Sequence, residues 1–159
     1  MAKKLVAANW KMNLLRSEAR ALVNSIHDYI GKDYSGVDVV LAPSFTLLET
    51  VGVLLEESNI ELGAQNIFWE NSGAYTGEIS PLMVKDLRCS WVIIGHSERR
   101  KIIGETDEIV SKKVKIALDS GLKIILCVGE TLEQREKGIE SEIIQNQVEI
   151  ALKNVNNDM

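Results

Sequence analysis

Short apolar runs rich in β-branched residues alternate with amphipathic stretches along most of the chain, and this alternation restricts its fold more than any other feature. The runs are apolar at consecutive positions, as expected for parallel strands buried on both faces. Consecutive strand and helix units favour a parallel α/β sheet with right-handed crossovers. The pattern alone leaves two architectures open, part of a barrel and an open doubly wound sheet. The predicted strands are residues 5–8, 37–42, 60–64, 91–94 and 123–128.

Helix start signals support five helices between and after these strands. The first has Ser17 as its expected N-cap. The third begins at Ser80 and Pro81, and the fourth begins near Thr106 with acidic residues in its first turn. The fifth is expected over residues 140–155. Its inward-facing residues are expected to be Ile144, Val148, Ala151 and Leu152.

Length and composition exclude several classes of protein. The 159 residues, 45% of them hydrophobic, suffice for one packed domain, so we expect a single domain over 1–159. No run approaches the roughly 20 apolar residues of a membrane span, which favours a soluble, untargeted protein. Cys89 and Cys127 lack metal-ligand spacing and are expected as free thiols in a reducing cytoplasm. The net charge of -5 argues against nucleic-acid binding, and no dinucleotide or P-loop motif occurs.

A long segment without periodicity, from Gln65 to Ile79, interrupts the alternation. Loops of this length in compact domains are usually functional or disordered, and the aromatic residues Phe68, Trp69 and Tyr75 argue against disorder. Two interpretations are open from the residues alone. The segment protrudes and docks on a partner subunit, or it packs back on its own domain.

Polar side chains follow three of the predicted strands where each strand ends. Asn9 and Lys11 follow the first strand and His96 follows the fourth. Glu130 follows the fifth. Because ligands of parallel α/β folds bind beyond the carboxyl ends of the strands, we expect these side chains on one rim. The partly shielded ammonium of Lys11 would suit a phosphate, with Glu98 as its carboxylate partner; a lysine that only extends into solvent is the alternative.

His96 precedes a polar stretch that is predicted to form a helical turn. Free N–H groups at the start of such a turn disfavour the imidazolium by their partial positive charge. A neutral ring can donate a hydrogen bond and polarise a carbonyl group, which makes His96 a candidate electrophile. Ser97 lies outside the strand-turn-helix context of a nucleophile, so nucleophilic catalysis finds little support.

Four motifs occur in a fixed order along the chain. They are NWKMN at 9–13, AYTGEIS at 74–80, GHSERR at 95–100 followed by Gly104 and Glu105, and CVGE at 127–130. In order and in position at strand ends they resemble the triosephosphate isomerase family across essentially the whole chain. The resemblance implies a (β/α)8 TIM barrel, here an incomplete barrel of about five parallel strand-helix units.

The resemblance also implies an activity, the interconversion of dihydroxyacetone phosphate and glyceraldehyde 3-phosphate through an enediolate in glycolysis and gluconeogenesis, without metal or organic cofactor. Asn9 and Lys11 would bind the substrate, with Lys11 near its phosphate. His96 would be the catalytic electrophile, and this family is itself the reference example of a neutral histidine in that role. The residues implied to support the site are Ser97, Glu98 and Glu130.

The AYTGEIS motif would belong to a loop that inserts into a second subunit near its active site. We therefore expect a cytoplasmic homodimer that assembles through the segment 65–79. The loop residues implied in this contact are Tyr75, Thr76, Gly77 and Glu78.

The family's barrel has eight units and about 250 residues, whereas this sequence supplies five units and 159 residues. The family's general base, mobile lid and glycine-rich phosphate loops belong to the other three units, so we expect none of them in this chain, and Glu130 is not expected to replace the base. The isolated polypeptide is expected to be poorly stable or to self-associate, because an open sheet leaves two unpaired edges. Two alternatives are a noncatalytic folding or assembly fragment of the enzyme and an unrelated doubly wound ligand-binding domain.

Overall fold

A computed structural model describes residues 3–30 and 36–155 of the chain. Its strands form one parallel sheet in the order β1-β2-β3-β4-β5, so each strand lies beside its neighbour in sequence. Sequential order fits an arc of a barrel and excludes the reversal of a doubly wound sheet. The strands are β1 (Lys4–Asn9), β2 (Val37–Ala42), β3 (Glu61–Ala64), β4 (Trp91–Ile94) and β5 (Lys123–Leu126).

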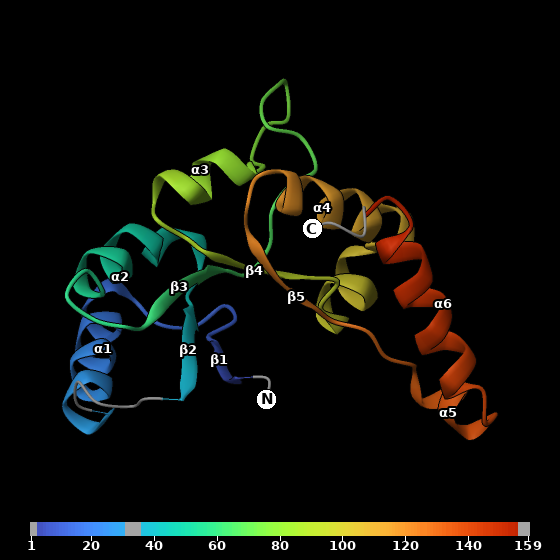
Figure 1. Cartoon of the computed structure of the whole chain (residues 1–159), viewed down its shortest axis with the longest axis horizontal. Helices are drawn as coiled ribbons and strands as arrows, with labels where there is room; N and C mark the ends of the chain where they lie inside the picture. Colours follow the sequence, from blue (N-terminus) through green and yellow to red (C-terminus); the bar gives the residue numbers. More distant parts are fainter. Residues whose placement is uncertain (1–2, 31–35, 156–159) are drawn as a thin grey trace.

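The helices lie in an arc outside the strands, and the described residues therefore form a curled half-barrel (Figure 1). This arrangement confirms the predicted incomplete TIM barrel. The main helices are α1 (Arg16–Ile30), α2 (Leu48–Leu54), α3 (Pro81–Asp86), α4 (Asp107–Asp119), α5 (Leu132–Glu136) and α6 (Glu140–Leu152). A 3-10 turn, η1 (Phe45–Leu47), precedes α2, and a π-helical turn, η2 (Arg99–Ile103), follows β4.

Two of the predicted helix starts are confirmed by their capping hydrogen bonds. The Ser80 hydroxyl accepts from the backbone N–H of Met83 at 3.2 Å, with Pro81 in the first helical position. The Thr106 hydroxyl accepts from the backbone N–H of Ile109 at 3.4 Å.

The predicted cap of the first helix is wrong. α1 begins at Arg16, so Ser17 lies inside the helix. The Glu18 carboxylate instead accepts from the backbone N–H of Leu15 at 2.7 Å and satisfies a free donor at the helix start. The last strand is shorter than predicted, because β5 ends at Leu126 and not at residue 128.

The hydrophobic core lies between the sheet and the surrounding helices. Strand residues that point outward from the curl pack against the apolar stripes of α1, α2 and α4, which is why those stripes recur at helical spacing. The core residues of the strands include Val39, Leu41, Leu62, Ala64, Val92 and Ile94. Those of the helices include Ala19, Val23, Leu48, Val51, Val84, Val110, Val114, Ala117 and Ala151.

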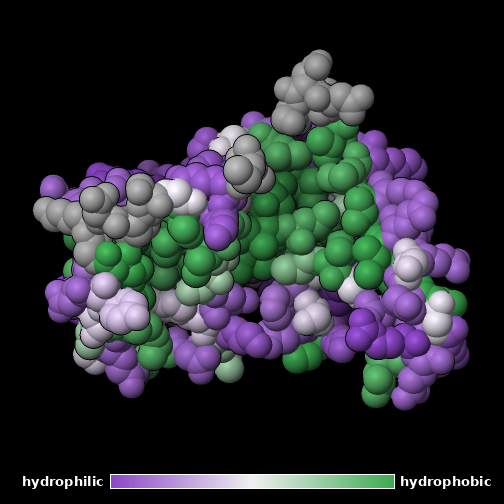
Figure 2. Space-filling model, turned by 60° about the horizontal axis from the view of Figure 1, so that its bottom comes forward, coloured by the Kyte–Doolittle hydropathy of each residue, from purple (hydrophilic) through white to green (hydrophobic). Residues whose placement is uncertain are grey.

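The open side of the half-barrel is apolar. Within the described residues, β1 and β5 each pair with one neighbour, so the sheet has two unpaired edges. Leu5 and Val6 of β1 are 41% and 56% exposed, so the prediction that the first strand is buried on both faces is wrong. Figure 2, with the bottom of the Figure 1 view turned forward, shows a broad hydrophobic area between hydrophilic margins. An edge and an apolar face of this kind are what further strands would cover.

α6 is less buried than its pattern predicted. Ala151 is buried, but Ile144 and Leu152 are exposed. α6 is the last helix of the arc and packs mainly on α4, so one flank of its apolar stripe has no neighbouring helix among the described residues.

A carboxylate at the start of β3 connects three strands. Glu61 accepts hydrogen bonds from Lys123 Nζ at 2.7 Å and Ser90 Oγ at 3.0 Å through Oε1, and from Trp91 Nε1 at 2.8 Å through Oε2. Burial alone would raise the pKa of Glu61, but these hydrogen bonds and the charge of Lys123 hold it below its usual range. The ionised carboxylate therefore stabilises the pairing of β3, β4 and β5.

No helix in the described parts of the chain has the length and hydropathy needed to cross a bilayer.

Candidate active site

Lys11 follows β1 with its backbone in the left-handed region, at a φ of 55°. This conformation is uncommon for a residue with a side chain, and neighbouring groups hold it in place. Asn9 Oδ1 accepts from the backbone N–H of Lys11 at 2.9 Å, and Gln65 Nε2 donates to the backbone oxygen of Lys11 at 2.8 Å. Gln65 also donates to the backbone oxygen of Ala42 at 2.9 Å. The ends of β1, β2 and β3 thus position Lys11 together.

Gln65 was not predicted as a site residue. The sequence indicates only that Gln65 is the first residue of the long segment 65–79. The signal that could have found it is its place directly after a buried parallel strand, on the rim that carries Asn9 and Lys11.

The ammonium of Lys11 pairs with Glu98, as the sequence predicted. Nζ of Lys11 donates to Oε1 of Glu98 at 2.7 Å. This hydrogen bond and the positive charge of Lys11 hold the pKa of the Glu98 carboxyl below its usual range. Both side chains are about half exposed, so an anionic ligand can reach the ammonium from solvent.

His96 follows β4 and begins the predicted helical turn. The backbone N–H groups of Arg99 and Arg100 donate to the backbone oxygen of His96 at 2.9 and 3.1 Å. The backbone N–H of Glu98 donates to Nδ1 of the imidazole at 3.2 Å. In a neutral ring with Nδ1 as acceptor, Nε2 carries the proton and is the donor. Glu98 Oε2 also lies 3.5 Å from Nδ1, so it is the shorter contact with the backbone N–H that favours the tautomer able to polarise a carbonyl oxygen.

Asn9, Lys11, Gln65, His96 and Glu98 line one pocket of about 260 Å³. Polar groups from β1, β3 and β4 therefore meet at the carboxyl ends of their strands. The volume suits a small polar ligand, since drug-sized ligands occupy roughly 300–1,000 Å³. The apolar part of the wall consists of Met12, Phe45, Ile102 and Ile103.

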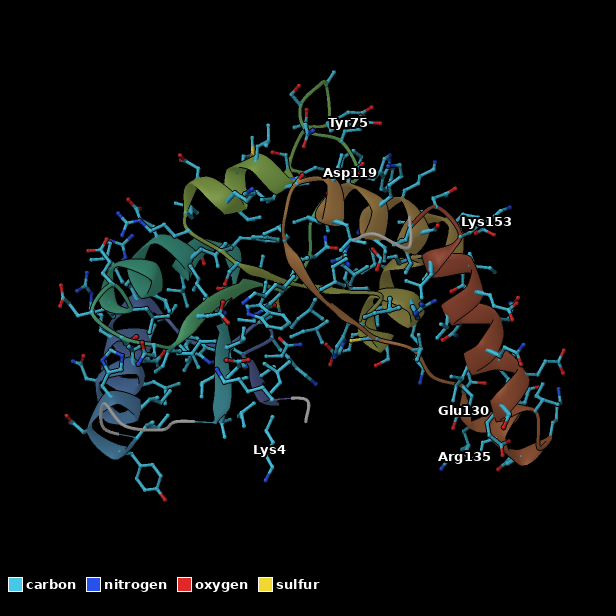
Figure 3. All side chains as sticks on the ribbon, viewed as in Figure 1. Lys4, Tyr75, Asp119, Glu130, Arg135 and Lys153 are labelled. Carbon is cyan, nitrogen blue, oxygen red and sulfur yellow. The ribbon has the colours of Figure 1, made fainter. Side chains whose placement is uncertain are left out.

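Glu130 lines a neighbouring pocket of about 430 Å³, which His96 and the exposed Ser97 also line. Arg135 Nε donates to Glu130 Oε1 at 2.7 Å, and Figure 3 shows the two side chains together at α5. A hydrogen bond to its own backbone N–H, with the contact to Arg135, holds the pKa of Glu130 below its usual range. Asn9 and Lys11 thus share a pocket with His96, and Glu130 faces the next one.

A buried ionic network supports the wall of the first pocket. Lys113 and Glu105 form an ion pair with side chains 3% and 2% exposed. Lys113 Nζ also donates to Asn66 Oδ1 at 2.7 Å, and Arg99 Nε donates to Glu105 Oε1 at 3.3 Å. Burial lowers the pKa of Lys113, and the contact with Glu105 opposes that effect. Lys113 was not predicted as a buried residue, although it lies three residues after Val110 on the apolar face of α4.

The side chain of Arg100 packs against the backbone next to His96. Its Nε donates to the backbone oxygen of Gly95 at 2.8 Å. Its Nη1 pairs with Asp107 in the first turn of α4, and its Nη2 lies 3.5 Å from the backbone oxygen of Cys127 after β5. The guanidinium therefore connects β4, β5 and α4 next to His96.

The segment 65–79 both packs on its own domain and protrudes from it. The backbone N–H of Phe68 donates to the backbone oxygen of Ile79 at 2.8 Å and closes its base. The buried Phe68 ring stacks on Trp69, with centroids 3.9 Å apart, and contacts Tyr75 at 4.5 Å. Residues 70–78 are exposed and project beyond α3 and α4 (Figure 1). The base of the segment therefore packs on its own domain, and residues 70–78 protrude from it.

Neither cysteine has the environment of a reactive thiol. Burial raises the pKa of Cys89 to about 12 and also raises the pKa of Cys127. Within residues 3–30 and 36–155, no group of three histidine, cysteine or acidic side chains could hold a metal ion.

A family model described as "Triosephosphate isomerase" matches residues 4–159. The chain is 48% identical to the triosephosphate isomerase of Dictyoglomus turgidum over 153 residues, which cover 96% of this chain and 61% of that protein. It is 50% identical to that of Thermoanaerobacter pseudethanolicus over 158 residues, 99% of this chain and 63% of the relative. It is 48% identical to that of Chlorobium luteolum over 155 residues, 98% and 62% of the two chains. The chain thus spans about three fifths of the length of these curated relatives.

Proposed function

The chain belongs to the triosephosphate isomerase family, and from this premise we propose that it supplies the substrate-binding and electrophilic part of a site that interconverts dihydroxyacetone phosphate and glyceraldehyde 3-phosphate. The observation that carries the proposal is that Asn9, Lys11 and His96 line one small pocket at the carboxyl ends of their strands.

Lys11 is proposed to bind the phosphate of the substrate. Its backbone is held by Asn9 and Gln65, so the position from which the side chain extends is fixed before the ligand arrives. Its ammonium is paired with Glu98 yet half exposed. A phosphate dianion would therefore join or replace the carboxylate as the partner of this cation.

His96 is proposed to be the electrophile. When a proton leaves the carbon beside the substrate carbonyl, the electron pair moves toward the carbonyl oxygen and forms an enediolate. A neutral imidazole that donates from Nε2 stabilises that developing charge, and the proton is then returned to the neighbouring carbon. The contact of Nδ1 with the backbone N–H of Glu98 supports this orientation of the ring.

Proton abstraction is assigned to neither carboxylate near His96. Among the described residues that line the first pocket, Glu98 is the only carboxylate, and Lys11 holds its pKa low. Glu130 in the second pocket also has a lowered pKa and is paired with Arg135. A lowered pKa makes each a weak base. We therefore assign the base to a group outside the described residues.

The partners of the whole protein follow from the same proposal. The segment 65–79 is proposed to mediate a homodimer in the cytoplasm. The exposed side chains that would contact the second subunit are Tyr75, Thr76 and Glu78, next to Gly77. Residues 1–159 are proposed to form one domain.

The test is a complementation assay. The 159-residue polypeptide is mixed with the part of the Thermoanaerobacter pseudethanolicus relative that it does not match, and formation of glyceraldehyde 3-phosphate from dihydroxyacetone phosphate is followed. We expect turnover only in the mixture. We expect His96→Gln to lower kcat about 100-fold, the loss typical of one donor to a developing oxyanion, while the surface variant Arg88→Gln keeps full rate. A mixture in which His96→Gln turns over normally would remove His96 from the mechanism.

One observation favours a second candidate function, a noncatalytic assembly fragment. The described residues expose an apolar face and two sheet edges, as a module that binds another polypeptide would. A mixture that forms a stable complex but shows no isomerase activity would favour this candidate.

A further inference from the structure

We propose that Arg100 is a positioning residue for His96, because its guanidinium holds the peptide group from which the imidazole projects into the pocket. The inference rests on the proposed function, since a fixed imidazole affects the reaction only if His96 is its electrophile.

The first contact fixes the peptide plane before His96. Arg100 Nε donates to the backbone oxygen of Gly95 at 2.8 Å. That oxygen and the backbone nitrogen of His96 belong to one planar peptide group, so a hydrogen bond to the oxygen also orients the start of His96. Gly95 has a φ of 75°, and glycine allows a wide range of backbone conformations. Arg100 thus restrains the glycine next to His96, where the backbone would otherwise have the most conformational freedom.

The second contact anchors the guanidinium itself. Nη1 of Arg100 pairs with Asp107 at the start of α4, and the two side chains are 15% and 25% exposed. A charge-assisted contact that is largely shielded from water orients the planar group. A Cβ atom on Gly95 would lie 3.1 Å from Arg100 Nη2 and 3.0 Å from the Cys127 backbone oxygen, so the guanidinium packs closely against this turn. A lysine has one compact ammonium and cannot reproduce this fork of donors.

The third contact connects the peptide plane to the ring. The backbone N–H groups of Arg99 and Arg100 donate to the His96 oxygen, and that of Glu98 donates to His96 Nδ1. Arg100 therefore donates to two successive backbone oxygens, from its side chain to that of Gly95 and from its backbone N–H to that of His96. Without the hydrogen bond from Arg100 to the Gly95 oxygen, the peptide group before His96 could rotate, and the hydrogen bond from the Glu98 N–H to Nδ1 would weaken.

The experiment uses ¹⁵N-histidine labelling, because the chain has only two histidines. In the wild-type polypeptide we expect His96 to show two well-separated ring-nitrogen signals, those of a tautomer protonated at Nε2. In Arg100→Gln and Arg100→Lys we expect loss of that separation and broadening of both signals. His27 on α1 is the internal reference and should not change. Arg88→Gln, which removes an exposed arginine paired with Glu56, is the matched control.

A merely structural role would lower the unfolding midpoint without changing the tautomer signature of His96. Unchanged His96 signals in both Arg100 variants would overturn the proposal. It would also be overturned if His27 changed equally or if both variants unfolded, since Arg100 would then act on general stability. If the Arg100 variants change the His96 signals as expected but the wild-type polypeptide stays inactive in the complementation assay, the proposed function is overturned. Arg100 then still positions the His96 ring, but without a role in this reaction.

Discussion

Nζ of Lys11 lies 2.7 Å from Oε1 of Glu98, although the two residues are 87 positions apart in the chain. The pair is half exposed, whereas the backbone of Lys11 is held on both sides by Asn9 and Gln65. The backbone contacts therefore fix where the Lys11 side chain starts, and the exposed ion pair with Glu98 adds little to stability.

Replacing Lys11 should separate binding from stability. Lys11→Met is expected to abolish measurable binding of dihydroxyacetone phosphate with little change in unfolding free energy. Lys11→Gly should also abolish binding but should stabilise the fold by about 0.5–1 kcal/mol, because glycine relieves the left-handed conformation. Binding is measured by NMR titration and stability by urea unfolding. Normal phosphate binding by Lys11→Met would place the phosphate elsewhere.

Lys113→Met is expected to destabilise the chain by about 3–5 kcal/mol, because it removes the buried cation of Glu105 and leaves the carboxylate with the longer contact to Arg99. The double variant with Glu105→Gln should recover part of that loss. Lys115→Met is the control, since Lys115 is exposed and pairs only with Asp119 one turn away, and a change below about 0.5 kcal/mol is expected. Urea unfolding of the four polypeptides tests this prediction, and equal effects at both lysines would contradict it.

Glu61→Gln is expected to reduce stability at neutral pH by about 1–2 kcal/mol, because a charged acceptor of three hydrogen bonds is lost. The pKa of Glu61 is lower in the folded chain than in the unfolded one, so its contribution is complete above about pH 4.3, the unfolded value. It is lost as the pH falls through the folded pKa, and the two proteins should then become equally stable. Unfolding curves from pH 7 to pH 3 measure this. A difference that persists undiminished at pH 3 would exclude the ionised carboxylate as its cause.

Gly73→Ala should disturb the exposed part of segment 65–79. A Cβ atom at Gly73 would lie 2.7 Å from the Tyr75 ring, at a φ of 143°. We expect the Tyr75 ring to leave Phe68, cleavage within residues 70–78 to rise several-fold in limited proteolysis, and unfolding free energy to fall by about 1 kcal/mol or less. Gly77→Ala is the control. Gly77 also has a positive φ, but a Cβ atom added there would have no neighbouring atom within 4 Å, so this variant introduces backbone strain without a clash with a ring. Equal cleavage of both variants would show that the ring contact is irrelevant.

The sheet could be predicted because its central strands contain runs of consecutive apolar residues. Val92, Ile93 and Ile94 are all buried, as strands covered on both faces must be. Leu5 and Val6 show the same pattern but are exposed. They lie on β1, which pairs with one neighbour among the described residues, and a pattern within one strand does not say how many neighbours that strand has.

The site was predictable where it depends on strand ends and was not where it depends on distant contacts. Asn9, Lys11 and His96 each follow a strand, and the parallel topology brings them together. Gln65 acts through the Lys11 backbone 54 positions away, and Lys113 reaches Asn66 across 47 positions. Neither contact follows from periodicity or spacing, because each depends on how closely two separate segments of the chain approach in the fold.

The hydrogen bond from Phe68 to Ile79 makes the ends of the intervening segment neighbours in space. When the two ends of a loop lie side by side, lengthening the loop costs little free energy, because the entropy of closing it rises only slowly with its length. A foreign peptide inserted between Asn71 and Ser72 would therefore leave the register of the sheet unchanged, and the half-barrel could serve as a scaffold for displaying epitopes.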